Sequence, residues 1–302
     1  MRRVLIAAIY ALFLLAACGA PKSPRPLLRL GLLGEPLGAA PALLAQDSLP
    51  LPLGLRRGAA ARTAPYLIAP SSMLPQLAGE GWIALGAACA SPPDTLLWHA
   101  TGLFSWQDLA KQGLYLAPGA DAPALGAAIA RYRGVLSPLP EPISQVGGVA
   151  GFEADPTGFL LAPEPIASSL LANGQAELAQ PLPDELGPYP SCLLLARRTT
   201  LQADPLLSLQ MVRALDLGLW RLSTEDPGQL ALALRPLVPG VSPSSLLRTV
   251  LTARQKGIFT SALNLSGSAL MNLEGEFARG RFPQGAVDDQ FARRALRDPF
   301  PH

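Results

Sequence analysis

The chain has 302 residues, of which 49% are hydrophobic and 15% charged, and its formal net charge at pH 7 is +2. This composition has enough hydrophobic residues to form the core of one or two domains. Nucleic-acid binding requires a strong excess of basic residues, which this chain lacks. With two histidines and three cysteines, the chain lacks the closely spaced ligands typical of zinc and copper enzymes. We therefore expect no nucleic-acid partner, no metal and no cofactor.

Residues 1–17 indicate a secretory signal peptide. Arg2 and Arg3 precede an apolar run, residues 4–15, that is too short to span a bilayer as a permanent helix. The run ends in Leu15-Ala16-Ala17-Cys18, which resembles a bacterial lipobox. The resemblance implies cleavage before Cys18, a lipid on its sulfur, and anchoring to the extracytoplasmic side of a membrane, inner or outer. The alternative is an ordinary signal peptide followed by an incidental cysteine.

Residues 18–26 are polar and contain prolines, which is typical of a short tether. From residue 27 onward, short apolar runs alternate with helical patterns, and this alternation predicts α/β layers with mostly parallel strands. The predicted strands cover residues 28–33, 49–55, 66–69, 82–88, 95–99, 114–117, 158–162 and 192–196. Helices are expected over residues 40–46, 72–78, 122–133 and 166–172, with a short helix opened by the capping box Ser105–Asp108.

The pattern changes after residue 203. Asp204-Pro205, Asp226-Pro227 and Ser242-Pro243 each place a capping side chain before a proline, which is a typical start of a helix. Apolar residues between 270 and 277 mark a fourth helix. Because this part shows no strand of its own, we expect it to pack on an earlier sheet.

Two cysteines remain once Cys18 carries a lipid. An extracytoplasmic compartment permits a disulfide between Cys89 and Cys192. The alternative is that both stay as buried thiols, which pack as small apolar side chains. The sequence leaves this choice open. The glycine-rich segment 147–151 lacks the Lys-Ser/Thr ending of a phosphate loop, so we interpret it as a flexible turn.

Five passages follow one another in a distinctive order. They are Gly34-Glu35-Pro36 with Ala40-Pro41-Ala42, then Ser105–Ala110, Leu116–Asp121, Leu161–Pro165 with Asn173-Gly174, and finally Asp204-Pro205 at the head of a long helix. Their order and spacing resemble the periplasmic solute-binding proteins of the nitrate, sulfonate and taurine type, a group that includes the thiamine-pyrimidine binders. One departure is Lys111-Gln112-Gly113, which stands where that family has Gly-Lys.

The resemblance implies a two-lobed α/β fold with a cleft between the lobes and a helical C-terminal part packed on the first lobe. Lobe I would comprise residues 27–98 and 195–302, and lobe II residues 99–194. A small-molecule ligand would bind as the lobes close like a hinge, and an ABC permease in the inner membrane would receive it. We therefore expect a monomeric binding protein and not an enzyme.

In open α/β sheets, ligands bind beyond the carboxyl ends of the strands, where turns expose helix N-termini. The candidate ligand-binding residues lie in four such turns and at the two predicted crossings: Glu35, Pro36, Ser71, Ser72, His99, Gly119, Asp121, Glu164 and Tyr189. Three of the four turns carry a carboxylate, which repels a desolvated anion and suits amine or ring N–H donors. We therefore predict a neutral or cationic nitrogen-containing ligand. Alternatively, the carboxylates only cap helices, and His99 and Tyr189 only pack at the hinge.

Other functions are less well supported. An enzyme is disfavoured because the chain has no G-x-S-x-G sequence and its internal histidine has no evident Ser or Cys partner. A sensor or envelope-associated lipoprotein without a permease would use the same fold, and the lack of Lys and Arg in the four turns is compatible with it. A sulfonate or nitrate binder is disfavoured by the carboxylates.

Overall fold

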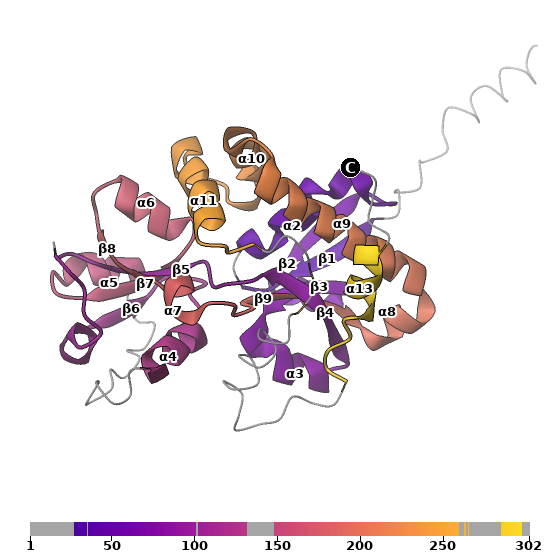
Figure 1. Ribbon diagram of the computed structural model, residues 1–302, viewed down its shortest axis with the longest axis horizontal. Helices are drawn as coiled ribbons and strands as arrows, with labels where there is room; N and C mark the ends of the chain where they lie inside the picture. The colour runs from indigo at the N-terminus through magenta and orange to yellow at the C-terminus, as the bar shows by residue number, and fades with distance from the viewer. Residues whose placement is uncertain are drawn as a thin grey trace, which may run out of the picture.

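The computed structural model describes residues 27–34, 36–100, 102–131, 148–259, 263, 265 and 285–297. These residues form two lobes that lie side by side, each built on its own sheet (Figure 1). None of the helices in these ranges is long and apolar enough to cross a membrane. The predicted signal peptide, Cys18, the tether and the helix expected near 270–277 lie outside the described residues.

The first sheet has five strands in the order β2-β1-β3-β9-β4. They are β1 (Leu28–Leu32), β2 (Leu53–Arg57), β3 (Tyr66–Pro70), β4 (Trp82–Cys89) and β9 (Cys192–Arg197). Strand β1 is parallel to β2 and β3, whereas β9 runs antiparallel between β3 and β4. The inner strands β3 and β9 are almost entirely buried because apolar clusters cover both faces of the sheet.

The second sheet repeats this plan with four strands in the order β6-β7-β5-β8. They are β5 (Asp94–Trp98), β6 (Leu114–Leu116), β7 (Phe159–Pro163) and β8 (Glu177–Pro181). Strands β6 and β7 are parallel, and β5 runs antiparallel between β7 and β8. Strand β5 in the second sheet therefore corresponds to β9 in the first, because each is the antiparallel strand next to an edge strand. Each is also the first strand after the chain changes lobe.

The chain changes sheet earlier than we predicted at both crossings. It leaves the first sheet after Cys89 and enters the second at Asp94, and it returns between Pro181 and Cys192. Residues 94–98 therefore belong to the second sheet and residues 192–194 to the first. Sequence patterns show where a buried strand lies but not which sheet it joins, because a fully buried strand fits the interior of either.

Short helices cover the two sheets. They are α2 (Ala40–Leu44), α3 (Leu74–Gly79), α4 (Ala122–Arg131), α5 (Gly148–Ala154), α6 (Ile166–Ala172) and α7 (Leu182–Leu186), with 3-10 turns at η1 (Pro36–Ala39), η4 (Ser71–Met73) and η5 (Asp108–Lys111). The predicted capping box is present in part. The Ser105 backbone N–H donates to Asp108 Oδ2 at 3.0 Å, but Ser105 Oγ accepts from the Gln107 N–H at 3.3 Å, and Gln107 is the N-cap of the 3-10 turn η5. Our interpretation of the glycine-rich segment as a flexible turn is wrong for residues 148–151, which begin α5. Packing of the fully buried Phe152 outweighs the low helix propensity of glycine there.

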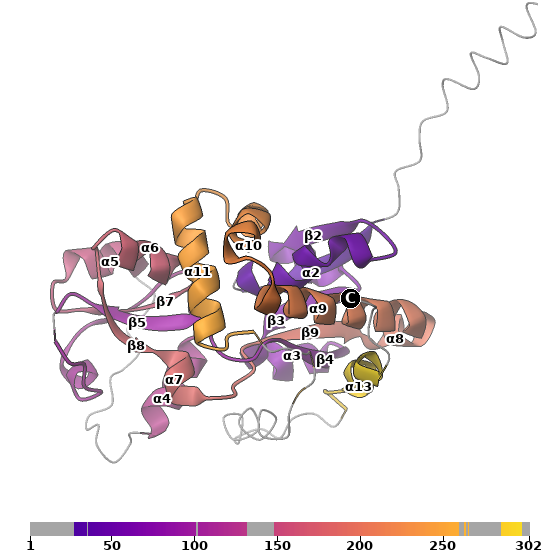
Figure 2. The same ribbon diagram turned by 45° about the horizontal axis from the view of Figure 1, so that its top comes forward.

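The C-terminal part is helical, as predicted. It comprises α8 (Arg198–Ala203), α9 (Pro205–Thr224), α10 (Pro227–Leu234), α11 (Pro243–Gln255) and α13 (Gln290–Arg297). The predicted caps Asp204, Asp226 and Ser242 each accept a hydrogen bond from the backbone amide three residues later, at 2.8, 2.9 and 3.1 Å. Figure 2 shows α11 standing between the lobes, where it packs against α10 and also against α6 of the second lobe.

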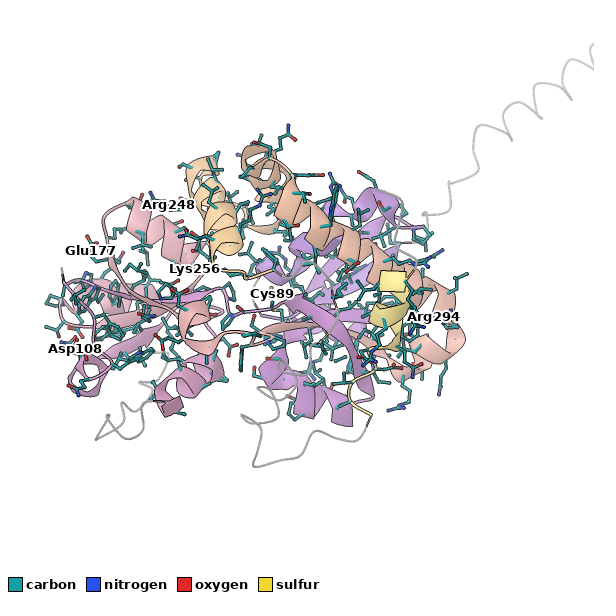
Figure 3. The ribbon with its side chains drawn as sticks, in the orientation of Figure 1. Cys89, Asp108, Glu177, Arg248, Lys256 and Arg294 are labelled. Atoms are coloured by element: carbon teal, nitrogen blue, oxygen red, sulfur yellow. The ribbon has the colours of Figure 1, made fainter. Side chains whose placement is uncertain are left out.

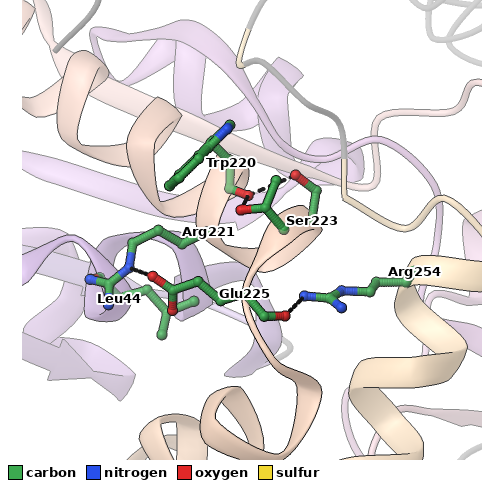
Figure 4. Close-up of polar contacts among 7 residues, drawn as sticks. Leu44, Trp220, Arg221, Ser223, Glu225 and Arg254 are labelled. Carbon is green, nitrogen blue, oxygen red and sulfur yellow. Dashed lines mark hydrogen bonds and ion pairs between the residues drawn. The ribbon is translucent and has the colours of Figure 1, made fainter. Parts of the chain in front are cut away.

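Two arginines hold the helices of this part together at the end of α9 (Figure 4). Arg221 pairs with Glu225, at 2.6 Å between Nε and Oε1, and also donates to the carbonyl oxygen of Leu44 in α2. Arg254 of α11 donates to the carbonyl oxygen of Glu225. These contacts fix α11 to the first lobe, so its contact with α6 joins the two lobes.

Candidate functional site: a pocket between the lobes

A pocket of about 90 Å³ lies between the lobes and is lined by both of them. Strands β3 and β6 end beside it, and β5 and β9 begin there. Its walls are Pro70 and Ser72 after β3, Pro93 and Asp94 at the first crossing, Gly119, Ala120, Asp121 and Pro123 between β6 and α4, and Ser191 and Cys192 at the return crossing. Strand-end turns from both lobes and both crossing segments therefore meet at one place.

A second, wider hollow adjoins this pocket. It measures about 490 Å³, shares Gly119 and Ala120 with the pocket, and reaches the start of α5 at Gly148 and Val149. Gly119 has a φ of +85°, a conformation that strains any residue with a Cβ. The turn between β6 and α4 therefore presents bare backbone to both hollows.

Asp94 is the most deeply buried carboxyl group of the pocket. It begins β5, is 1% exposed, and accepts a hydrogen bond at Oδ1 from the backbone N–H of Asp121 at 3.0 Å. Burial, together with the nearby carboxylates of Asp121 and Glu164, raises the pKa of Asp94 to about 8. At neutral pH this side chain is therefore a neutral acid, which would ionise when a cation binds beside it.

Asp121 caps a helix and lies in the pocket wall. Its Oδ1 accepts from the backbone N–H of Ala124 at 3.1 Å, which caps α4. It also lines the pocket. Burial raises its pKa to about 6. The pocket thus holds two carboxyl groups that ionise less readily than carboxyl groups in water.

Glu164 follows β7 and is 2% exposed, but it is not part of the pocket lining. Its Oε2 accepts from the backbone N–H of Ser168 at 3.3 Å and from Thr249 Oγ1 at 3.1 Å. Burial raises its pKa against the effect of these hydrogen bonds. Since Thr249 lies on α11, this carboxyl group links the second lobe to the C-terminal helices. The predicted ligand contact of Glu164 stays a prediction.

The remaining predicted residues of the first lobe lie at different depths. Ser72 lines the pocket. Ser71 is fully buried next to it, with its backbone N–H donating to the Ser191 carbonyl at 2.8 Å and its Oγ lacking a partner among the described residues. Pro36 begins η1 and is outside the lining. Glu35 lies outside the described residues.

His99 and Tyr189 are not among the residues that line the pocket. His99 follows Trp98, the last residue of β5, whereas Asp94 is the first residue of β5. His99 therefore lies at the far end of this strand from the pocket. There His99 stacks on Phe152, with ring centroids 4.0 Å apart and Nε2 3.0 Å from the Phe152 carbonyl oxygen. Tyr189 is 1% exposed and packs in the core of the second lobe.

Sequence reasoning missed Asp94 and the residues of the return crossing. A signal was present, because Asp94 stands between two prolines and an apolar strand. A charged residue at the start of a strand that is fully buried indicates that the strand begins at a polar site. Our prediction places the crossing at the other end of this strand and therefore leaves Asp94 out of the site.

The charged groups that line the pocket are all acidic among the described residues. Among the described residues that line it, there is no Lys, Arg or His, and the ionisable oxygen groups are the carboxyls of Asp94 and Asp121. Within the part of the chain that the structure describes, no three His, Cys, Asp or Glu side chains are grouped closely enough to hold a metal. The described lining therefore offers carboxyl and hydroxyl groups for hydrogen bonding and no positive side chain.

No protein-family model and no curated protein matches the sequence. Solved structures share its fold. The ligand-binding component of an ABC-type import system from Staphylococcus aureus, solved with zinc bound, is 12% identical with a TM-score of 0.69 over 90% of this chain and 99% of that one. The alkanesulfonate-binding protein SsuA from Xanthomonas axonopodis pv. citri is 18% identical with a TM-score of 0.65, over 88% and 99% of the two chains.

The periplasmic nitrate-binding protein NrtA from Synechocystis is 12% identical with a TM-score of 0.63, over 94% of this chain and 91% of that one. These likenesses extend over nearly the whole length of each chain. They establish the two-lobed α/β fold of periplasmic binding proteins for this chain.

Proposed function

We propose that this protein is a solute-binding protein that captures a small molecule between its lobes and delivers it to an ABC import permease. The observation that carries the proposal is the meeting of strand-end turns and both crossings at one pocket. A ligand held there touches both lobes, so it stabilises the closed arrangement. The import proteins among the structural neighbours support this function.

The ligand in this proposal is a neutral or cationic nitrogen-containing small molecule. An ammonium group or a ring N–H donates to the carboxyl oxygens of Asp94 and Asp121, and a cation balances the charge that forms when Asp94 ionises. A nitrate or sulfonate would meet these carboxyls, and no described residue of the lining carries a positive side chain to compensate. The proposed ligand therefore differs from those named for the alkanesulfonate- and nitrate-binding neighbours.

Calorimetric titration tests this ligand class. The panel comprises diamines, polyamines and aminopyrimidines against alkanesulfonates and nitrate. At least one nitrogen compound should bind, and Asp94→Asn should weaken it by at least about tenfold because a charged hydrogen bond is lost. The exposed Asp47 provides the control, since Asp47→Asn should leave the affinity unchanged. Tight binding of a sulfonate or nitrate, with no response to any amine, would contradict the proposal.

We further propose that the mature protein begins at Cys18, carries a lipid there, and is held outside the cytoplasm by the tether of residues 18–26. Two tests follow. Metabolic labelling with an alkyne fatty acid should tag the wild type, and Cys18→Ala should abolish the tag and move the protein out of the membrane fraction. An unlabelled wild type, or a variant that stays in the membrane fraction, would contradict lipidation.

A sensor or envelope-associated lipoprotein without a permease is the second candidate. The small volume of the pocket, about 90 Å³, favours it, because ligand pockets commonly measure roughly 300–1,000 Å³. Uptake of the labelled ligand by whole cells separates the two candidates. Loss of uptake on deletion of the gene supports import, whereas unchanged uptake supports sensing.

A further inference from the structure

Cys89 and Cys192 lie opposite each other where the two lobes meet. Cys89 is the last residue of β4, before the first crossing, and Cys192 is the first residue of β9, after the return crossing. The two are direct partners in the antiparallel β4–β9 pairing. Figure 3 shows Cys89 at the junction between the two halves of the molecule.

Both side chains point to the same face of the sheet. Cys89 and Cys192 belong to one apolar cluster, together with Leu194, whereas Ala87 and Leu193 pack in the cluster on the opposite face. Regular alternation would turn Ala88 and Cys89 to opposite faces. The irregularity of β4 between Ala87 and Cys89 places both in the same cluster.

The spacing of such a pair suits a covalent bond. Opposed residues in antiparallel strands have Cα atoms roughly 4.5–5.5 Å apart, which lies inside the range of about 4.4–6.8 Å found for disulfides. Both residues stand as thiols in the structure, 0% and 3% exposed. Cys192 is also one of the residues that line the pocket.

We propose that Cys89 and Cys192 form a disulfide that ties the two crossing segments together beside the pocket. The oxidant is a disulfide-bearing exchange partner, which the proposed extracytoplasmic location would supply. The Cys192 thiolate attacks one sulfur of that disulfide, forming a mixed disulfide and releasing one thiolate. The Cys89 thiolate then attacks Cys192 Sγ and releases the second, so the cysteines lose two protons and two electrons and the oxidant leaves as two thiols.

The bond would enclose the whole second lobe in a loop of roughly 100 residues. Closing so long a loop restricts the unfolded chain strongly. It also fixes the ends of β4 and β9 to each other, so both crossings start from one covalently held point. Lobe closure would then be confined to the crossing segments themselves.

The test uses the purified full-length chain under native conditions with oxidised glutathione, followed by thiol alkylation, digestion and mass spectrometry. We expect a linked pair of peptides joining Cys89 to Cys192, two hydrogens lighter than the thiol form and lost on treatment with dithiothreitol. The oxidised protein should melt roughly 5–15 °C above the reduced protein. Since Cys18 lies on a different peptide, its reactions are read separately.

The single variants Cys89→Ala and Cys192→Ala serve as controls, since each should melt at the same temperature with and without the oxidant. Two results would overturn the proposal. One is recovery of both cysteines as alkylated thiols or as glutathione adducts after oxidation. The other is an unchanged melting temperature of the wild type. Neither result depends on the ligand, so failure here is distinct from failure of the proposed function.

Discussion

Replacing Asp94 by Asn should make the stability of this protein less dependent on pH. The amide oxygen of Asn can still accept from the Asp121 backbone N–H, so the local structure is kept. In the folded wild type the pKa of Asp94 is about 8, whereas in the unfolded chain an Asp ionises near pH 3.9. The stabilising effect of the proton is therefore fully present below about pH 4. It is lost as the pH rises toward 8.

The magnitude follows from proton linkage. Between pH 5 and pH 7 the folded state holds about one more proton at Asp94 than the unfolded state. The free energy of unfolding therefore falls by about 1.4 kcal/mol for each unit that the pH rises. The wild type should thus lose about 2.7 kcal/mol relative to Asp94→Asn over this range, or roughly 5–10 °C in melting temperature. Thermal melts of both proteins at pH 5, 6 and 7 measure the difference. Parallel curves for wild type and Asp94→Asn would refute the reasoning, and Asp47→Asn should follow the wild type.

Three further predictions concern packing and the cleft. Gly218→Ala should destabilise the protein by about 2–3 kcal/mol in denaturant titrations, because its Cβ would lie 1.9 Å from a carbonyl oxygen of α2; Gly126→Ala, with open space around it, should not destabilise. Thr249→Val should cost about 1–3 kcal/mol by the same measurement, since buried Glu164 loses its donor from α11; an unchanged midpoint would show that this bond contributes nothing. The Kd of a cationic ligand should fall by up to about tenfold per pH unit from pH 6 to 8, as Asp94 ionises more easily, and a Kd that rises over this range would contradict the carboxyl as its partner.

Local signals in the sequence were sufficient for most elements of the fold. The caps at Asp204, Asp226 and Ser242 were predictable because a side-chain acceptor before a proline fixes a helix start within a few residues. Strand β8 was not predicted. It is largely exposed at the edge of the second sheet and shows little apolar periodicity.

The site was predictable only in part. Ser72, Gly119 and Asp121 line the pocket because each follows a strand whose carboxyl end faces the cleft. Our prediction placed the end of β5, with His99, at the cleft and so left out Asp94 at its start. The direction of β5 depends on its antiparallel pairing with β7. That pairing joins residues far apart in the chain, and no local pattern encodes it.

Native mass spectrometry of the protein purified from its own cells tests the central claim most directly. We predict a copurified small molecule that carries an amine, an amidine or a ring N–H group and that is absent from the Asp94→Asn protein. A sulfonate or nitrate bound to wild type and variant alike would contradict the account.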